Sequence, residues 1–218
     1  MMRSHRLILI VAILLGTGYF WLRGGFVGIG AAVAPAAAAQ AQGDAPRPDG
    51  YVLATFASGC FWCTESDFEK VNGVVSAVSG YTGGQVAKPS YEEVSSGGTG
   101  HREAVEVTFD PAKVSYAKLL DVFWHSIDPT DNSGQFCDHG EQYRAGIFYR
   151  NAEQKRLAEA SREALRKRFP RIATDVLPAG PFYPAEDYHQ DYYKKNPVRY
   201  HFYRFNCGRD ARLSEVWK

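Results

Sequence analysis

Two cysteines stand three positions apart in the stretch "ASGCFWCTESDFEKV", residues 57–71. Before them, "YVLATFAS" (51–58) alternates like a strand and Gly59 interrupts it, and after them the pattern is helical. Cys60 is therefore expected at the N-terminus of a helix, where free N–H groups and the helix dipole lower the pKa of a thiol. This placement predicts a reactive thiolate.

A thiol–disulfide oxidoreductase is the first function that such a pair suggests. Cys60-x-x-Cys63 between a strand and a helix is the arrangement of thioredoxin-like redox pairs. However, Phe61 and Trp62 stand between the two cysteines, and a redox pair that must meet another protein's disulfide has little use for two large rings. The rings suit a pocket that accepts a small apolar group.

Metal binding and plain core packing also compete as explanations of the cysteines. Zinc ligands usually come as two tight pairs, whereas here one C-x-x-C pair is followed only by a C-x-H segment and a distant cysteine. Free cysteine is also often a small buried residue, an option that stays open for Cys137 in its polar loop. A non-enzymatic redox-sensing or metal-binding domain is thus a third possible function. Its candidate ligands are Cys60, Cys63, Cys137, His139 and Cys207.

The elements expected to position these residues mix strands and helices without strict alternation. This mixture favours an α+β domain, a two-layer sandwich in which helices cover a mixed β-sheet. Two long loops, 82–101 and 129–144, are expected to carry function, because long loops in compact domains are usually functional or disordered. The tail after Pro197 is expected to be irregular. Strands are predicted at 51–58, 74–81, 103–110, 145–150 and 172–179, and helices at 60–71, 115–128, 151–169 and 184–196.

The first 43 residues are typical of an export segment. A basic start is followed by an uncharged apolar run at 7–22 and by the Ala-rich stretch "AAVAPAAAAQAQG" (31–43), which offers small-residue cleavage sites. The run is slightly shorter than the roughly 20 residues of a spanning helix, so a cleaved signal peptide and an uncleaved inner-membrane anchor are both considered. Either alternative places the domain in the oxidising periplasm. Residues 44–50 are expected to be a linker and 51–218 the folded domain.

The charge balance argues against nucleic acid as a partner. The whole chain has a formal net charge of +1, and without the three arginines of residues 1–43 this falls to −2. A nucleic-acid-binding surface needs an excess of Lys and Arg that neutralises phosphates. With 218 residues, of which 45% are hydrophobic, the chain is long enough for one packed domain, and we expect a monomer.

Seven separated blocks resemble the A-type peptide methionine sulfoxide reductases. Together they cover most of the chain from about Tyr51 to the C-terminus. The blocks are "GCFW" (59–62), "GYTGG" (80–84), "PSYEEV" (89–94), "GTGHREAVEVTFDP" (98–111), "FWHSIDPT" (123–130), "DHGEQYRAGIFY" (138–149) and "YHQDYYKKNP" (188–197). The resemblance implies a ferredoxin-like plait core, reduction of methionine S-sulfoxide in proteins and of free methionine sulfoxide, and no metal or organic cofactor.

The resemblance also implies roles for individual residues. Cys60 matches the nucleophile that attacks the sulfoxide sulfur and becomes a sulfenic acid while methionine leaves. Phe61 and Trp62 match the aromatic wall that receives the S-methyl group of the substrate. Glu103 matches the acid that protonates the sulfoxide oxygen. For that task, burial and the neighbouring thiolate must raise the pKa of the carboxyl group.

Further residues match the polar surroundings of the reacting oxygen in the family. Tyr91 and Tyr143 match tyrosines that donate hydrogen bonds to the sulfoxide oxygen, and Asp138 matches a second carboxylate near the pocket. His139 and His189 are expected to support the same loops and are left out of the catalytic set.

Regeneration of Cys60 requires a second thiol. A sulfenic acid condenses with a nearby thiol, and a disulfide needs Cα atoms about 4.4–6.8 Å apart. Family members usually use a cysteine of the C-terminal tail, which favours Cys207 as the resolving cysteine. Cys63, one helical turn from Cys60, is the alternative. Family members commonly have a small residue at this position. The partners that the resemblance implies are oxidised proteins or peptides with methionine sulfoxide and a thioredoxin-like reductant.

Overall fold

The computed structural model describes residues 50–218 of the chain. The expected export segment (1–43) and all of the expected linker (44–50) except Gly50 lie outside the described residues. Within residues 50–218, no helix combines the length and the apolar character that crossing a membrane requires.

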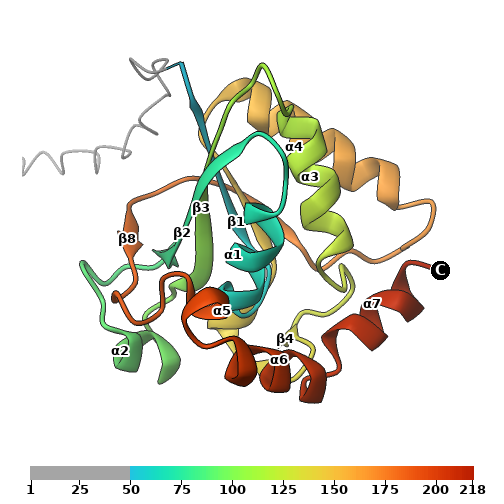
Figure 1. The fold of residues 1–218 in the computed structure, drawn as a ribbon. Helices are drawn as coiled ribbons and strands as arrows, with labels where there is room; N and C mark the ends of the chain where they lie inside the picture. The colour runs from blue at the N-terminus through green and yellow to red at the C-terminus, as the bar shows by residue number, and fades with distance from the viewer. Residues whose placement is uncertain (1–49) are drawn as a thin grey trace, which may run out of the picture. The chain divides into compact units, whose positions relative to one another are not determined.

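A mixed sheet of six strands forms the centre of the fold (Figure 1). Neighbouring strands are antiparallel except β6 and β7, which run parallel. In spatial order the strands are β7 (Asp175–Pro178), β6 (Gly146–Tyr149), β1 (Val52–Ala57), β3 (Arg102–Phe109), β2 (Val74–Thr82) and β8 (Phe182–Pro184). Two short strands, β4 (Gly134–Gln135) and β5 (Asp138–His139), form a separate hairpin. The predicted α+β class with a mixed sheet is confirmed.

Seven α-helices and one short 3₁₀ turn lie in the described part of the chain. They are α1 (Phe61–Glu69), α2 (Tyr91–Ser95), α3 (Tyr116–His125), α4 (Ala152–Leu165), α5 (Tyr192–Lys195), α6 (Pro197–Asn206), α7 (Arg209–Val216) and the turn η1 (Glu141–Tyr143). The main core contains buried side chains from α1, α3 and α4 together with those of the central strands. In its middle, the Phe56 ring of β1 stacks on Phe68 of α1 and Phe123 of α3, with centroids 4.8 and 5.4 Å apart. Such aromatic packing fixes α1, and with it the residue that precedes α1, against the sheet.

Side-chain caps determine where three of the helices begin. Ser115 caps α3 and Asn151 caps α4. Ser90 and Glu93 form a full capping box at the start of α2. These side chains satisfy N–H groups that have no partner inside the helix. The first turn of α2 is thereby held in place within the long loop 82–101.

The C-terminal tail differs from the prediction. It is not irregular but forms α6 and α7, which Gly208 separates with a positive φ of 69°. Pro197, expected to end a helix, occupies the first turn of α6, where the missing N–H group has no role in the helix. Of the helix predicted at 184–196, only α5 (Tyr192–Lys195) forms, and residue 184 belongs to β8 instead. Contacts with the rest of the domain, such as those of the buried Arg209, stabilise these helices more than their own sequence pattern does.

The tail lies across the end of the sheet at which β1 ends and α1 begins (Figure 1). Cys60, Cys63 and Tyr200 of α6 form one buried cluster there. The two long loops also lead to this end of the sheet, since 82–101 contains α2 and 129–144 contains β4, β5 and η1. Three segments that are remote from Cys60 in the sequence, the tail and the two long loops, therefore surround it.

Candidate active site

Cys60 lies between β1 and α1, as predicted, and is the N-cap residue of α1. It is 6% exposed. The preceding Gly59 has a φ of 83°, and a Cβ atom there would lie 2.7 Å from Cβ of Gln135. Only glycine fits this close approach and this backbone conformation. Gly59 thus allows the chain to turn from the strand into the helix with the thiol facing the tail.

Cys60 and Cys63 are both free, buried thiols that are hydrogen-bonded to each other. Burial, more than any other influence, raises the pKa of Cys60 well above its ordinary value. The pKa of Cys63 is lowered to about 7, chiefly by the hydrogen bond from Cys60 and also by Arg209 and Arg204, against the opposing effect of burial. Cys63 is therefore the more acidic of the two thiols. The expectation that the helix N-terminus makes Cys60 the acidic thiol is wrong, because removal from solvent outweighs the helix dipole.

Glu103, on β3, points into the interior and is 3% exposed. Its Oε2 accepts a hydrogen bond of 2.9 Å from the backbone N–H of Phe61, the residue after the nucleophile. The pKa of Glu103 is raised to about 8, chiefly by burial and also by the charges of Asp138 and Cys63, against the lowering effect of the hydrogen bond from Phe61. Glu103 therefore holds a proton at neutral pH, directly beside the start of α1.

Tyr91 and Tyr143 come from the two long loops and are hydrogen-bonded to each other. Tyr91 is the first residue of α2, and its backbone N–H donates to Oε1 of Glu186 at 2.9 Å. Burial raises the pKa of both tyrosines, and the charge of Glu103 raises it further. Both hydroxyls therefore keep their protons and can act as hydrogen-bond donors near Glu103.

Phe61 and Trp62 differ in exposure. Phe61 is 1% exposed and belongs to the main core. Trp62 is half-buried, and its indole stacks on Tyr192 with ring centroids 3.7 Å apart. Of the two predicted substrate-binding rings, Trp62 therefore has the free surface, while Phe61 lies behind it.

His189 holds these rings together. The Trp62 indole N–H donates to Nδ1 of His189 at 3.0 Å, and the His189 ring also contacts the rings of Phe61 and Tyr91. Burial lowers the pKa of His189, so the ring is neutral and its proton is on Nε2, opposite the nitrogen that accepts from Trp62. His189 thus contacts both aromatic residues after Cys60 and Tyr91 of the loop 82–101. His139, by contrast, is exposed on β5.

Asp138, on β5, is hydrogen-bonded to a tyrosine that no sequence motif distinguishes. Its Oδ2 accepts from the hydroxyl of Tyr203, on α6, at 2.5 Å. Burial raises the pKa of Asp138, whereas the hydrogen bond from Tyr203 and the charges of Arg209 and His139 lower it. One tyrosine among thirteen, in a tail expected to be irregular, gave no sequence signal for this contact.

Cys137 and Cys207 form a disulfide, with Cα atoms 4.9 Å apart. Cys207, the preferred resolving cysteine, is thus paired with Cys137, and Cys63 is the thiol that contacts Cys60. Cys137 is exposed and is not the plain buried cysteine that the sequence left open. Among residues 50–218, no group of possible ligands within metal-binding distance combines Cys60 or Cys63 with Cys137 or Cys207, so the candidate ligands of the alternative zinc site do not converge.

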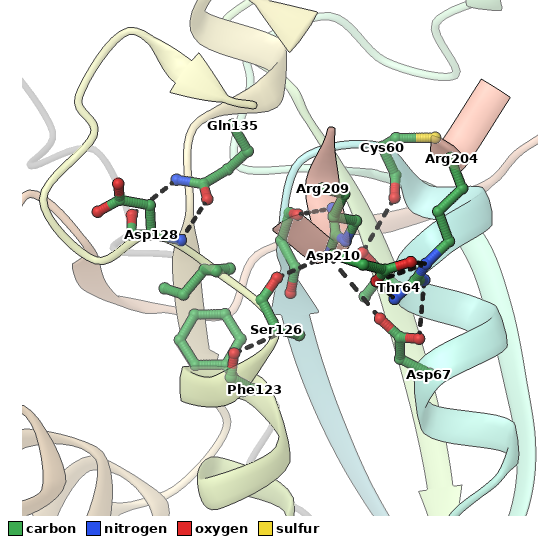
Figure 2. A network of polar contacts seen from close by, with 12 residues as sticks. Cys60, Thr64, Asp67, Phe123, Ser126, Asp128, Gln135, Arg204, Arg209 and Asp210 are labelled. Atoms are coloured by element: carbon green, nitrogen blue, oxygen red, sulfur yellow. Dashed lines mark hydrogen bonds and ion pairs between the residues drawn. The ribbon is translucent and has the colours of Figure 1, made fainter. Parts of the chain in front are cut away.

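Two arginines fasten the tail to this site (Figure 2). The Arg209 guanidinium is 1% exposed and donates to the carbonyl of Ser58, just before the nucleophile, at 3.2 Å and to that of Ser126 at 2.7 Å. Arg204 donates to the Asp67 carboxylate of α1 at 2.9 Å. The tail is therefore tied both to the end of β1 and to α1, on either side of Cys60.

The groups around Cys60 combine a nucleophile, an acid and hydrogen-bond donors. A thiol nucleophile, Cys60, lies beside a carboxylic acid that is protonated at neutral pH and beside tyrosine hydroxyls that can donate hydrogen bonds. Such a site can attack an electrophilic atom while an oxygen bound to that atom is stabilised and protonated. A disulfide shuttle needs neither the acid nor the donors.

Comparisons with known proteins agree with this chemistry. The family model described as "Peptide methionine sulfoxide reductase" matches residues 52–218. Peptide methionine sulfoxide reductase MsrA of Bacillus licheniformis is 55% identical over 169 residues, which cover 76% of this chain and 93% of the relative. Two solved structures share the fold. Mxr1 from Saccharomyces cerevisiae in its reduced form has a TM-score of 0.66 at 34% identity and covers 70% of this chain and 89% of its own.

The second solved structure is methionine sulfoxide reductase A of Corynebacterium diphtheriae, with a TM-score of 0.64 and 35% identity. The alignment covers 70% of this chain and 77% of that one. The match of the family model extends over nearly the whole described part of the chain, from β1 to the end of the tail. The chain belongs to the peptide methionine sulfoxide reductase family and, within it, to the A type.

Proposed function

We propose that the domain reduces methionine S-sulfoxide to methionine, in oxidised proteins or peptides and as the free amino acid. The observation that carries the proposal is the buried Glu103, protonated at neutral pH beside the thiol of Cys60. Reduction of a sulfoxide by a thiol needs a nucleophile for the sulfur and a proton for the oxygen, and these two groups supply both. The domain is thus an oxidoreductase that repairs oxidised proteins.

In the first step, Cys60 attacks the sulfoxide sulfur. Cys63, the thiol with the lower pKa, accepts the proton of Cys60, and Glu103 protonates the sulfoxide oxygen. In net terms, one oxygen atom passes from the sulfoxide to the Cys60 sulfur, so methionine is released and Cys60 becomes a sulfenic acid. The cysteine is oxidised by two electrons and the methionine sulfur is reduced by two.

The surrounding residues bind and polarise the substrate. Tyr91 and Tyr143 donate hydrogen bonds to the sulfoxide oxygen as negative charge develops on it. Asp138 adds a second carboxyl group close to the nucleophile. Trp62, with Phe61 behind it, receives the S-methyl group, since aromatic rings make favourable contacts with sulfur-containing groups. The free surface of Trp62 supports this assignment.

Regeneration of Cys60 uses Cys63 first and Cys207 second. Cys63 condenses with the sulfenic acid and releases water. Reduced Cys207 then attacks the Cys63 sulfur, and Cys137 completes the exchange, which leaves free thiols at 60 and 63. The structure has this final distribution, with two buried thiols and one disulfide between 137 and 207, and this supports the order. A thioredoxin-like dithiol protein would then reduce the disulfide, whose Cys137 side is exposed.

We assign the core of the sheet to a ferredoxin-like plait. The helix α1 connects β1 to β2, α3 leads from β3 towards β6, and the four strands have the spatial order β6-β1-β3-β2. A β-α-β-β-α-β unit with antiparallel neighbours supports this assignment. The strands β7 and β8 then extend the plait at its two edges.

Outside the described residues, we propose that 1–43 is a cleaved signal peptide or an inner-membrane anchor, followed by a linker at 44–50. The monomeric domain would then act in the periplasm and, with its net charge of −2 once the three arginines of 1–43 are removed, would not bind nucleic acid. N-terminal sequencing of the exported protein decides between the two. A start near Gln40 or Gln42 means cleavage, and an intact Met1 or Met2 in the membrane fraction means an anchor.

The function is tested with separated S and R epimers of a methionine sulfoxide substrate and dithiothreitol as the reductant. We expect the wild type to consume the S epimer and to leave the R epimer, and we expect Cys60→Ser to consume neither. Methionine formation is followed by chromatography. Consumption of neither epimer by the wild type would refute the proposed function, and consumption of the R epimer alone would refute the assigned stereochemistry.

A further inference from the structure

Helix α6 brings to the nucleophile one hydroxyl group that the mechanism above does not use. The Tyr203 hydroxyl donates to Oδ2 of Asp138 at 2.5 Å and is within hydrogen-bonding reach of the Cys60 thiol. The Tyr203 ring meets the Trp62 ring edge-on, with centroids 5.7 Å apart. One side chain of the tail therefore contacts the nucleophile, the second carboxyl group and the aromatic wall.

A covalent bond joins the same two chain segments. Cys137 directly precedes Asp138, and Cys207 follows Tyr203 by four residues, about one helical turn. The Cys137–Cys207 disulfide therefore lies next to the Tyr203–Asp138 hydrogen bond and links the hairpin of β4 and β5 to α6. The disulfide limits how far Tyr203 can move away from Asp138.

We propose that Tyr203 is a positioning residue for sulfoxide reduction: it keeps the Asp138 carboxyl group ionised and oriented beside Cys60 and Glu103, and the Cys137–Cys207 disulfide fastens α6 in the place where Tyr203 can do so. The proposal rests on the proposed function. Tyr203 acts through Asp138 and does not itself donate a proton to the substrate.

The electrostatic consequence extends to Glu103. The hydrogen bond from Tyr203 is the largest influence that lowers the pKa of Asp138 against the effect of burial. An ionised Asp138 in turn raises the pKa of Glu103. Without the Tyr203 hydroxyl, Asp138 is neutral over a wider range of pH, and Glu103 then loses its proton at a lower pH.

Other groups also face the two carboxyl groups, and none of them changes in the substitution proposed below. Those facing Asp138 besides Tyr203 are Arg209 of α7, His139 of β5, Tyr143 of η1, Glu103 of β3 and Cys60. Those facing Glu103 besides Asp138 are Cys60, Cys63, Tyr81, Tyr91 and Tyr143.

The test is Tyr203→Phe, which removes the hydroxyl and keeps the ring against Trp62. Full-length protein with the Cys137–Cys207 disulfide intact and with Cys60 and Cys63 reduced is mixed with methionine S-sulfoxide, and methionine formed in the single turnover is measured by rapid quenching over a range of pH. We expect the rate at neutral pH to fall about tenfold, as is typical for the loss of a hydrogen bond to a charged group. We also expect the alkaline decline of the rate, which follows the deprotonation of Glu103, to move to lower pH.

Tyr200→Phe is the matched control. Tyr200 is a buried tyrosine on the same helix, one turn earlier, and its hydroxyl accepts a hydrogen bond from Arg204 in place of contacting Asp138. We expect the single-turnover rate of Tyr200→Phe to decline at the same alkaline pH as that of the wild type. If Tyr203→Phe slows the reaction without moving the decline, or leaves the rate unchanged, the positioning role is wrong. A wild type that forms no methionine would instead overturn the proposed function.

The role of the disulfide is tested by Cys137→Ser, alone and combined with Tyr203→Phe. The double-mutant cycle compares the wild type, Tyr203→Phe, Cys137→Ser and the double variant. The conditions keep the Cys137–Cys207 disulfide formed in the wild type and in Tyr203→Phe, the two proteins that contain both cysteines. If the disulfide fastens α6, Tyr203→Phe has a smaller effect on the single-turnover rate in the Cys137→Ser background, because Tyr203 is already less well placed there. Equal effects in both backgrounds overturn the fastening role.

Discussion

Glu103 shows how one buried side chain can determine the rate of the first step. Its pKa of about 8 keeps a proton available at neutral pH beside Cys60. Glu103→Gln preserves the shape and can still accept from the Phe61 N–H group, but it cannot deliver a proton. We expect the single-turnover rate to fall by about 10²- to 10⁴-fold, while Cys60 remains open to alkylation. A rate near that of the wild type would mean that a tyrosine or water supplies the proton.

The same residue makes stability depend on pH. In the folded state Glu103 keeps its proton up to about pH 8, whereas the unfolded chain releases it near the ordinary value of 4.5. The folded state binds more protons between these values, so the stability contribution is fully present below pH 4.5 and is lost as pH rises through 8. Glu103→Gln does not titrate.

We therefore expect the thermal midpoint of Glu103→Gln, relative to that of the wild type, to increase from about pH 5 to about pH 8. Calorimetry of both proteins at the two pH values measures this difference. A difference that stays constant with pH would mean that Glu103 is ionised in the folded protein at neutral pH.

Residue types were easier to predict than protonation states. The position of Cys60 at the start of a helix followed from the alternation before Gly59 and the helical pattern after it. Its raised pKa did not follow, because the burial comes from Tyr200 and other tail residues that are remote in sequence. The lowered pKa of Cys63 likewise depends, besides the hydrogen bond from Cys60, on Arg209 and Arg204 of the tail.

At the scale of elements, the tail was the least predictable part. The sequence "VRYHFYRFNCGRDARLSEVWK" has no clean apolar stripe, and three of its apolar residues, Val198, Phe202 and Phe205, are strongly exposed. The helices α6 and α7 depend instead on polar anchors that only the folded domain supplies. By contrast, the central strands and the capped helices α3 and α4 follow from local alternation and periodicity.

Arg209 is the central anchor of α7 and can be tested directly. Arg209→Met keeps much of the length of the side chain but leaves the carbonyls of Ser58 and Ser126 without this donor. We expect the free energy of unfolding to fall by about 2 kcal/mol or more, because buried acceptors lose their partners. Urea unfolding measures this loss. Hydrogen exchange should also become faster in α6 and α7.

The exposed Arg199 of α6 provides the control. Arg199→Met removes the same charge from the tail without emptying a buried site, so its free energy of unfolding should stay within about 0.5 kcal/mol of the wild type. Equal losses for the two substitutions would show that the net charge of the tail matters and the buried contacts of Arg209 do not.

At the scale of the whole molecule, the four cysteines divide into two pairs with different surroundings. The pair at 60 and 63 is buried beside Glu103, where a sulfenic acid is protected from further oxidation by solvent species. The pair at 137 and 207 lies nearer the surface, with Cys137 exposed. The tail connects the pairs, because α6 contributes to the buried cluster and ends at Cys207. This division separates the chemistry on the substrate from the contact with the reductant.

The relay predicts how many methionines each chain can form without an external reductant. Every sulfoxide takes two electrons, and each pair of thiols supplies two when it becomes a disulfide. Fully reduced protein should therefore form about two methionines per chain, and protein with the Cys137–Cys207 disulfide intact about one. Chromatography after a long incubation with excess sulfoxide measures these yields. Cys207→Ser should form about one, since only the buried pair can then be oxidised.

Cys63→Ala distinguishes the relay from direct resolution by Cys207. If Cys63 must act first, the variant stops at the sulfenic acid of Cys60 and forms about one methionine per chain. If Cys207 attacks the sulfenic acid directly, Cys137 can displace it afterwards, Cys60 is freed for a second reaction, and the yield is about two. A sulfenic-acid trap added after the reaction should label Cys60 in both cases, because Cys60 ends without a thiol that can resolve it. Peptide mapping distinguishes the cases, since Cys137 and Cys207 stay reduced in the first and are joined by a disulfide in the second. A yield of two with a Cys137–Cys207 disulfide would make Cys207 the direct partner of Cys60 and would leave Cys63 with only its role as the neighbouring, more acidic thiol.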